Sequence, residues 1–101
     1  MITNAIKKKK ITNDKLYHNG STTIEELIEY FYYSGIGEFS YCEDITWYVR
    51  AEVRPTDKKW CPAIGTTINV DETWSFYDSY EELIEKHVFP NGKTMLEMLF
   101  E

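Results

Sequence analysis

The sequence predicts an α+β fold: a single domain with an N-terminal helix, a four-stranded antiparallel β-meander and two C-terminal helices packed on one face of the sheet. Three observations lead to this prediction. Apolar residues recur at helical spacing near both ends of the chain, apolar and polar residues alternate in between, and the connections between the alternating segments are short. A chain of 101 residues is long enough to bury one hydrophobic core, so a single domain is expected.

The first helix is predicted over residues 23–34. Thr22 is expected to cap it by accepting from the backbone N–H of Glu25, whose carboxylate would reach back to form a capping box. Gly35 and Gly37 are expected to end the helix. Its apolar face is formed by residues at i, i+3, i+4 and i+7, namely Ile24, Leu27, Ile28 and Phe31.

Four strands are predicted at residues 38–42, 45–54, 60–70 and 74–76. In the second, clearest strand one face would be buried and the other exposed to water. Gly65 is read as a β-bulge in the third strand. The predicted buried face of the second strand carries Ile45, Trp47, Val49, Ala51 and Val53, and the wet face carries Thr46, Tyr48, Arg50, Glu52 and Arg54.

The second long helix is predicted from Asp78, because residues 78–85 repeat the pattern of residues 22–29 and share the letters Glu-Glu-Leu-Ile-Glu. Thr94 and Glu97 form a further predicted capping box, which opens the last helix. The core is predicted to include Leu27, Ile28, Phe31, Phe39, Trp47, Val49, Ile68, Trp74, Phe76, Leu83, Ile84, Leu96 and Leu99.

Charge is distributed unevenly along the chain. Five lysines and one aspartate give residues 1–20 a charge of +4, so the rest of the chain must carry −10 to reach the net −6. Residues 1–20 are therefore predicted to be a basic, partly ordered tail, in which Ile11, Leu16 and Tyr17 could dock as a short edge strand, and residues 21–101 to be an acidic domain. Such a domain repels nucleic acids and membrane surfaces and favours basic partners.

Four segments together resemble short uncharacterised α+β proteins of Gram-positive bacteria and their phages. The resemblance covers residues 22–101, concerns structural residues, and implies a small α+β domain without a catalytic residue. The basic start and Cys61-Pro62 are not part of the pattern. The segments are Glu38-Phe39-Ser40-Tyr41, Trp74-Ser75-Phe76, Ser79-Tyr80-Glu81-Glu82-Leu83 and Gly92-Lys93-Thr94-Met95-Leu96-Glu97.

No catalytic, cofactor or metal site is predicted. Cys42, Cys61, His18 and His87 lack the short spacings that position zinc ligands, and His87 is expected at the edge of a helix face. Two cysteines without a signal peptide indicate reduced thiols, and no apolar run is long enough for a membrane span, which together predict a cytoplasmic protein.

Three weaker patterns that could indicate catalysis or ligand binding have simpler explanations. Cys61 lies near Lys58 and Lys59, which would favour a thiolate, but it has no recognisable base. The carboxylate pairs 43–44 and 71–72 fall at predicted turns, where exposed acids are ordinary. Residues 35–37 have two glycines but lie between a helix and a strand, the reverse of the dinucleotide-binding order. We therefore predict that the protein is not an enzyme.

The function predicted is non-catalytic binding of a basic protein partner. The sharpest form of this hypothesis is a phage or mobile-element inhibitor of a basic nucleic-acid-processing enzyme, comparable to anti-CRISPR proteins. The alternatives are a small structural subunit that forms a homodimer, and a weak nucleic-acid binder that uses the basic tail with Tyr48, Arg50 and Arg54. The residues predicted to contact a partner are Glu26, Glu29, Asp44, Tyr48, Arg50, Asp71, Glu72, Glu82 and Glu85.

Overall fold

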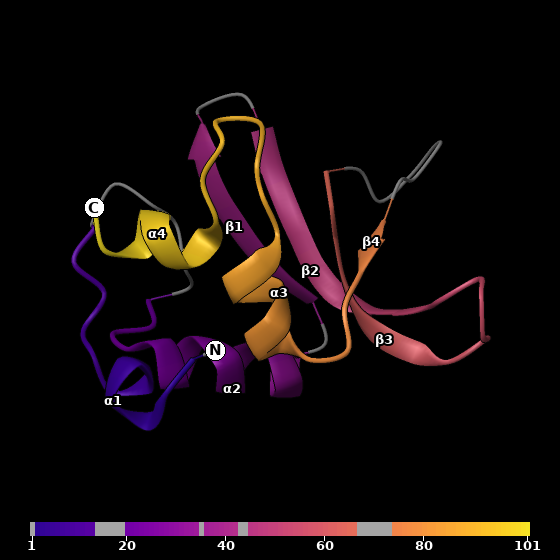
Figure 1. The fold of residues 1–101 in the computed structure, drawn as a ribbon, viewed down its shortest axis with the longest axis horizontal. Helices are drawn as coiled ribbons and strands as arrows, with labels where there is room; N and C mark the ends of the chain where they lie inside the picture. The colour runs from indigo at the N-terminus through magenta and orange to yellow at the C-terminus, as the bar shows by residue number, and fades with distance from the viewer. Residues whose placement is uncertain (1, 14–19, 35, 43–44, 67–73) are drawn as a thin grey trace.

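A computed structural model describes residues 2–13, 20–34, 36–42, 45–66 and 74–101, and within them it has the predicted α+β class. Figure 1 shows α3 between α2 and α4, with the β2–β3 hairpin projecting away from the helices. Helix α1 lies in a segment where the sequence predicts no helix. The elements are α1 (Asn4–Lys7), α2 (Ile24–Ser34), β1 (Ile36–Cys42), β2 (Ile45–Val53), β3 (Trp60–Gly65), β4 (Ser75–Phe76), α3 (Tyr80–Lys86) and α4 (Met95–Leu99).

The sheet is four-stranded and antiparallel, in the order β1-β2-β3-β4. Val49 in β2 lies opposite Gly37 in β1 and Ile64 in β3. Gly65 pairs in register with Tyr48, so the bulge predicted there is absent. The register shifts instead between Ser40 and Cys42 of β1. Neighbouring strands thus pair antiparallel, as predicted for a meander.

All three predicted helix starts have a side-chain cap, but the first two caps lie one residue later than expected, so the capping box predicted between Thr22 and Glu25 is wrong. Thr23 Oγ1, rather than Thr22, accepts from the Glu26 N–H at 3.2 Å. Ser79 Oγ, rather than Asp78, accepts from the Glu82 N–H at 3.0 Å. Thr94 and Glu97 make a complete capping box, as predicted. The shift is possible because each motif offers two adjacent capping residues. Ser79, the second residue of its pair, has the extended backbone that a cap needs.

The hydrophobic core lies between the helices and the sheet residues Val49 and Ile64. Of the predicted core, Trp47 and Leu96 are only partly buried against it, and Trp74 and Phe76 are half-buried outside it. The side chain of Phe39 and the whole of Ile68 lie outside the described residues. The predicted residues that are buried in the core are Leu27, Ile28, Phe31, Val49, Leu83, Ile84 and Leu99.

The second face of the sheet differs from its prediction. Cys61 and Ala63 are buried there, and the Arg50 guanidinium lies over the Trp74 ring and forms an ion pair with Glu52. On the side predicted to be buried, Ala51 and Val53 are exposed. The reason is that β2 runs out of the helical layer into the projecting hairpin (Figure 1), so that an alternating pattern alone does not fix which half of the strand is covered.

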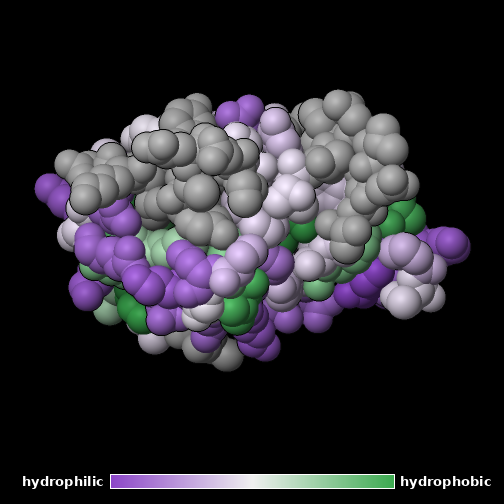
Figure 2. All heavy atoms as spheres, turned by 90° about the horizontal axis from the view of Figure 1, so that it is seen from above, coloured by the Kyte–Doolittle hydropathy of each residue, from purple (hydrophilic) through white to green (hydrophobic). Residues whose placement is uncertain are grey.

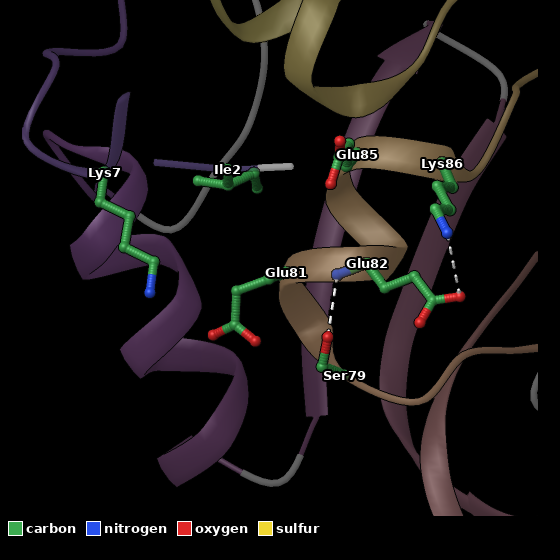
Figure 3. A pocket seen from close by; sticks show the side chains of 7 residues that line it. All are labelled: Ile2, Lys7, Ser79, Glu81, Glu82, Glu85 and Lys86. Atoms are coloured by element: carbon green, nitrogen blue, oxygen red, sulfur yellow. Dashed lines mark hydrogen bonds and ion pairs between the residues drawn. The ribbon is translucent and has the colours of Figure 1, made fainter. Parts of the chain in front are cut away.

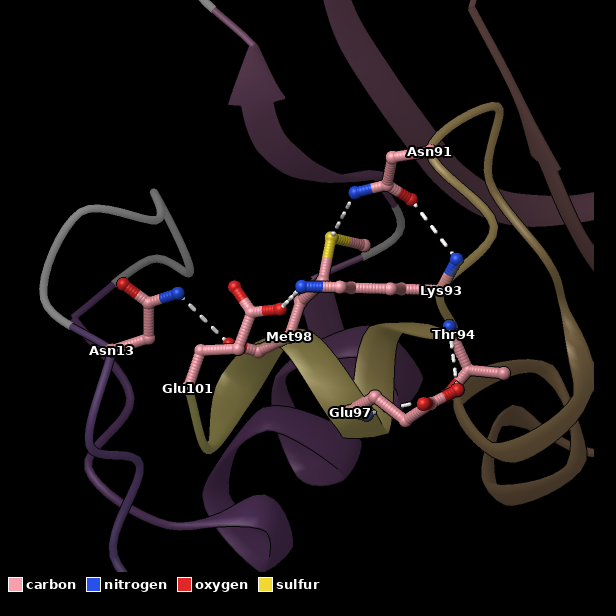
Figure 4. Close-up of polar contacts among 7 residues, drawn as sticks. All are labelled: Asn13, Asn91, Lys93, Thr94, Glu97, Met98 and Glu101. Carbon is pink, nitrogen blue, oxygen red and sulfur yellow. Dashed lines mark hydrogen bonds and ion pairs between the residues drawn. The ribbon is translucent and has the colours of Figure 1, made fainter.

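Residues 2–13 pack against the domain rather than lying apart from it. Ile2 is buried, and Ile11, predicted to dock at a sheet edge, instead donates its N–H to the carbonyl of Thr22. The Thr12 and Asn13 N–H groups both donate to the Leu99 carbonyl, while Asn13 Nδ2 donates to the Met98 carbonyl at 2.9 Å (Figure 4). The segment therefore supplies partners for carbonyl groups at the end of α4, which that helix cannot satisfy itself.

Candidate protein-binding surface on α2 and α3

Helices α2 and α3 are joined by aromatic packing at one end of the candidate surface. Tyr80 of α3 packs against Phe31 and Tyr32 of α2, with ring centroids 5.7 and 4.7 Å apart. Tyr32 Oη also donates to Glu81 Oε2 at 3.4 Å. Burial, and then the Glu81 carboxylate, raise the pKa of Tyr32, which keeps its hydroxyl protonated. This contact holds one acidic side chain beside the seam between the helices.

A surface hollow of about 580 Å³ lies between the N-terminal segment and α3. Figure 3 shows Lys7 and Glu81 reaching toward the hollow from opposite sides. The Glu82 carboxylate lies 3.8 Å from the Lys86 ammonium, a spacing typical of a weak helical ion pair. The residues that line the hollow are Ile2, Lys7, Ser79, Glu81, Glu82, Glu85 and Lys86.

A second hollow, of about 230 Å³, lies next to the first and shares Lys7 with it. Tyr32 and Tyr33 of α2 are part of its wall, and both are exposed, Tyr33 to 87%. Exposed tyrosines offer an apolar ring and a hydroxyl together, a combination that is enriched at protein interfaces. The remaining residues of the wall are Lys7, Glu25, Ile28 and Glu29.

We call the surface around both hollows the acidic face. The described residues that line the two hollows include five carboxylates and two ammonium groups, those of Lys7 and Lys86, so acids outnumber bases in the lining. A surface of one predominant sign concentrates ligands of the opposite sign and speeds their association. The carboxylates that define the acidic face are Glu25, Glu29, Glu81, Glu82 and Glu85.

The nine residues predicted to contact a partner lie in different places. Glu29, Glu82 and Glu85 belong to the acidic face. Glu26 is exposed, but its Oε2 accepts from the Thr22 N–H and hydroxyl at 2.8 and 3.0 Å, which lowers its pKa. Tyr48 and Arg50 lie on the second face of the sheet, and Asp44, Asp71 and Glu72 lie outside the described residues.

Sequence reasoning missed Lys7, Tyr32 and Tyr33 as residues of this surface, and it noted Glu25 and Glu81 as acids of exposed helix faces without including them among the predicted contacts. The repeated motif already marked Glu25 and Glu81 as first-turn acids, but it did not show that the two helices would lie together. The signal for Tyr32 and Tyr33 was their place just beyond the apolar positions of α2. Only the packing of α1 beside α2 brings Lys7 between the hollows.

The arginines of the predicted nucleic-acid platform are engaged with acids. Arg54 makes a bidentate pair with Asp57, at 3.1 and 2.6 Å, and reaches Asp78 at 3.1 Å. The guanidinium beside it lowers the pKa of Asp57 to about 2. Arg50 pairs with Glu52 over Trp74. These pairs neutralise the charge that phosphate binding would need.

The cysteine and metal hypotheses gain no support from the described residues. Cys61 is buried opposite Glu52, so its thiol is shielded from a substrate. Within the described ranges, no three His, Cys, Asp or Glu side chains are grouped as metal ligands. The side chain of Cys42 and the whole of His18 lie outside those ranges.

No described helix has the length and the apolar composition needed to cross a bilayer. Comparisons with protein-family models, with curated proteins and with solved structures found no match to this chain.

Proposed function

We propose that this protein acts without catalysis, by binding a basic segment of a partner protein on the acidic face. The observation that carries the proposal is the excess of carboxylates around two adjoining hollows, with exposed tyrosines beside them. Lysine or arginine side chains of a partner would enter the hollows, and their stems would pack on the tyrosine rings. The acidic charge of the whole domain would add long-range attraction.

The partner class that we favour is a basic nucleic-acid-processing enzyme, whose phosphate-binding groove the acidic face would occupy. Such a groove is lined with Lys and Arg, and a surface of fixed carboxylates competes for the same side chains. This form of the proposal makes the protein an inhibitor encoded by a phage or a mobile element. It is supported by the charge of the domain and by the pairing of its half-buried arginines, Arg50 and Arg54, with acids.

Charge reversal on α3 tests the proposal. The double variant Glu82→Lys/Glu85→Lys should weaken binding to an immobilised arginine-rich peptide at least about tenfold, measured by surface plasmon resonance. Wild-type affinity should also fall as salt rises toward 0.5 M. The control, Glu38→Lys, changes an exposed acid of β1 outside both hollows and should retain binding. Equal affinities for the double variant and the wild type would reject the acidic face as the binding surface.

Self-association is a second candidate function, favoured by the projecting hairpin. Trp60 and Val53 are paired across β3 and β2 and are both exposed, Trp60 to 72%. On the face shown in Figure 2, the hydrophobic side chains that are drawn in colour form small separate patches. Light scattering of wild type and Trp60→Glu decides: a dimer that this change dissociates supports self-association, and a monomer at all concentrations rejects it.

A further inference from the structure

His87 occupies an unusual environment at the end of α3. Its side chain is 9% exposed, and its Nδ1 lies 2.8 Å from the Tyr77 hydroxyl. The rings of Trp47 and Phe89 meet the imidazole edge-on, with centroids 5.8 and 4.9 Å away. Because burial disfavours the charged form, the pKa of His87 lies below its ordinary value, and the ring is neutral at neutral pH.

The second ring nitrogen of His87 is left unsatisfied. Nε2 is buried and has no hydrogen-bond partner within the described part of the chain. Its role depends on Tyr77: Nε2 carries the proton if the Tyr77 hydroxyl donates to Nδ1, and a lone pair if that hydroxyl accepts. Native proteins rarely leave such an atom without a partner, because its lost hydration is not replaced. The arrangement suits a ligand that brings one matching polar atom.

A pocket of about 380 Å³ adjoins this imidazole, and we call it the His87 pocket. This volume lies within the range of small-molecule sites, and a cavity of about 150 Å³ already admits benzene, so there is room for two fused rings. None of the described lining residues is charged. The lining includes Trp47, Ile64, Thr66, Ser75, His87 and Phe89, which combine apolar and aromatic surface with two hydroxyls.

We propose that the His87 pocket binds a small, uncharged aromatic heterocycle, whose rings pack against Trp47 and Phe89 and whose heteroatom forms a hydrogen bond with His87 Nε2. Because Nε2 is shielded from solvent, entry of the ligand requires a small shift of the neighbouring side chains. The proposal is independent of the acidic face, because no described residue that lines the His87 pocket also lines either hollow of the acidic face.

Three two-ring probes test the proposal on the full chain labelled with ¹⁵N. Indole donates a hydrogen bond, quinoline accepts one, and naphthalene does neither. Either indole or quinoline, according to the tautomer, should bind about tenfold more tightly than naphthalene. The favoured probe should also shift the ¹⁵N resonance of His87 Nε2. No saturable shift at Trp47, His87 and Phe89 with any probe would overturn the proposal.

His87→Phe is the matched variant, because it keeps a buried ring and removes both nitrogens. In this variant the three probes should bind with similar affinities, while Glu38→Gln, at an exposed residue of β1 outside the three hollows, should leave the wild-type order unchanged. An unchanged preference in His87→Phe overturns the proposal. If this variant fails to fold, the wild-type Nε2 resonance decides, since equal shifts with naphthalene and with the heterocycles also overturn it. A third outcome would also overturn the proposal: a tryptophan-containing peptide shifts the pocket resonances, but the free heterocycles do not. This result would assign the pocket to a side chain of a partner protein.

Discussion

Helices α2 and α3 contain the same five residues, Glu-Glu-Leu-Ile-Glu, and use them differently. In both, the leucine and the isoleucine are buried, and a hydroxyl side chain caps the second glutamate's N–H. The carboxylates of the two helices make different contacts. Glu26 bonds back to Thr22, whereas its counterpart Glu82 pairs with Lys86 and lines the first hollow. An identical local pattern therefore determines the helix and its buried stripe, while the neighbours decide what the acids do.

The largest expected effect concerns the part that the helices share. Leu27→Ala and Leu83→Ala each remove a fully buried side chain, so each should lower the free energy of unfolding by about 2–5 kcal/mol. Urea denaturation followed by circular dichroism measures both. Similar losses would show that the two stripes are equivalent. A loss below about 1 kcal/mol in either variant would contradict its place in the core.

Helix α2 packs against β1, whereas α3 packs against β3. A Cβ at Gly37 would lie 2.6 Å from two ring carbons of Phe31, so Gly37→Ala should destabilise the protein by about 1–3 kcal/mol. Phe31→Leu removes the ring, so the double variant Gly37→Ala/Phe31→Leu should lose less stability than the sum of the losses in the two single variants. Thermal unfolding of the three variants tests this coupling, and strict additivity would show that the ring does not obstruct the new methyl group.

The caps are expected to contribute almost equally. Thr23→Ala and Ser79→Ala each leave one N–H of a first turn without its side-chain acceptor, at a cost of about 1 kcal/mol. Thr23→Ser and Ser79→Thr keep the acceptor and should behave nearly as wild type. Chemical denaturation at one pH compares the four. A neutral alanine variant at either site would show that this helix does not depend on its cap.

The smallest expected effect is a pH dependence of stability caused by His87. Phe31 occupies the equivalent position after the motif in α2, and it does not titrate. Because burial lowers the folded-state pKa of His87 below its ordinary 6.5, the unfolded state binds the proton more readily. Stability should thus be complete above pH 6.5 and should decline as the pH falls toward the folded pKa. Urea titrations at several pH values should show this decline in wild type and a smaller one in His87→Phe. Identical pH profiles would refute the assignment to His87.

Much of the fold could be predicted because its signals are local. The helical spacing of Leu27 and Ile28, repeated at Leu83 and Ile84, identified buried faces, and the alternation around Val49 identified a strand. The errors have a physical cause in long-range packing. Ala51 and Val53 continue the apolar alternation but are exposed, since the hairpin extends past the helices. Ile2 and Phe89 are buried although neither belongs to a periodic segment.

The candidate sites were less accessible to sequence reasoning. It selected Glu29, Glu82 and Glu85 from their helix positions, but it could not bring Lys7 and Tyr32 to the same hollow. It placed His87 at the edge of a helix face, whereas the structure buries it against Trp47 and Phe89. Those three rings come from positions 47, 87 and 89, and no short sequence motif predicts that they contact one another.

By itself, the sequence determined the helices, their caps, the buried stripes and the uneven charge, because hydrogen bonds and periodicity within a few residues decide these features. Only the tertiary structure decided which acids share a surface, which half of β2 is covered and which nitrogen of His87 is shielded. These depend on contacts between segments far apart in the chain, which a local pattern cannot specify. The repeated Glu-Glu-Leu-Ile-Glu shows both levels at once: two similar helices, and two different environments for their carboxylates.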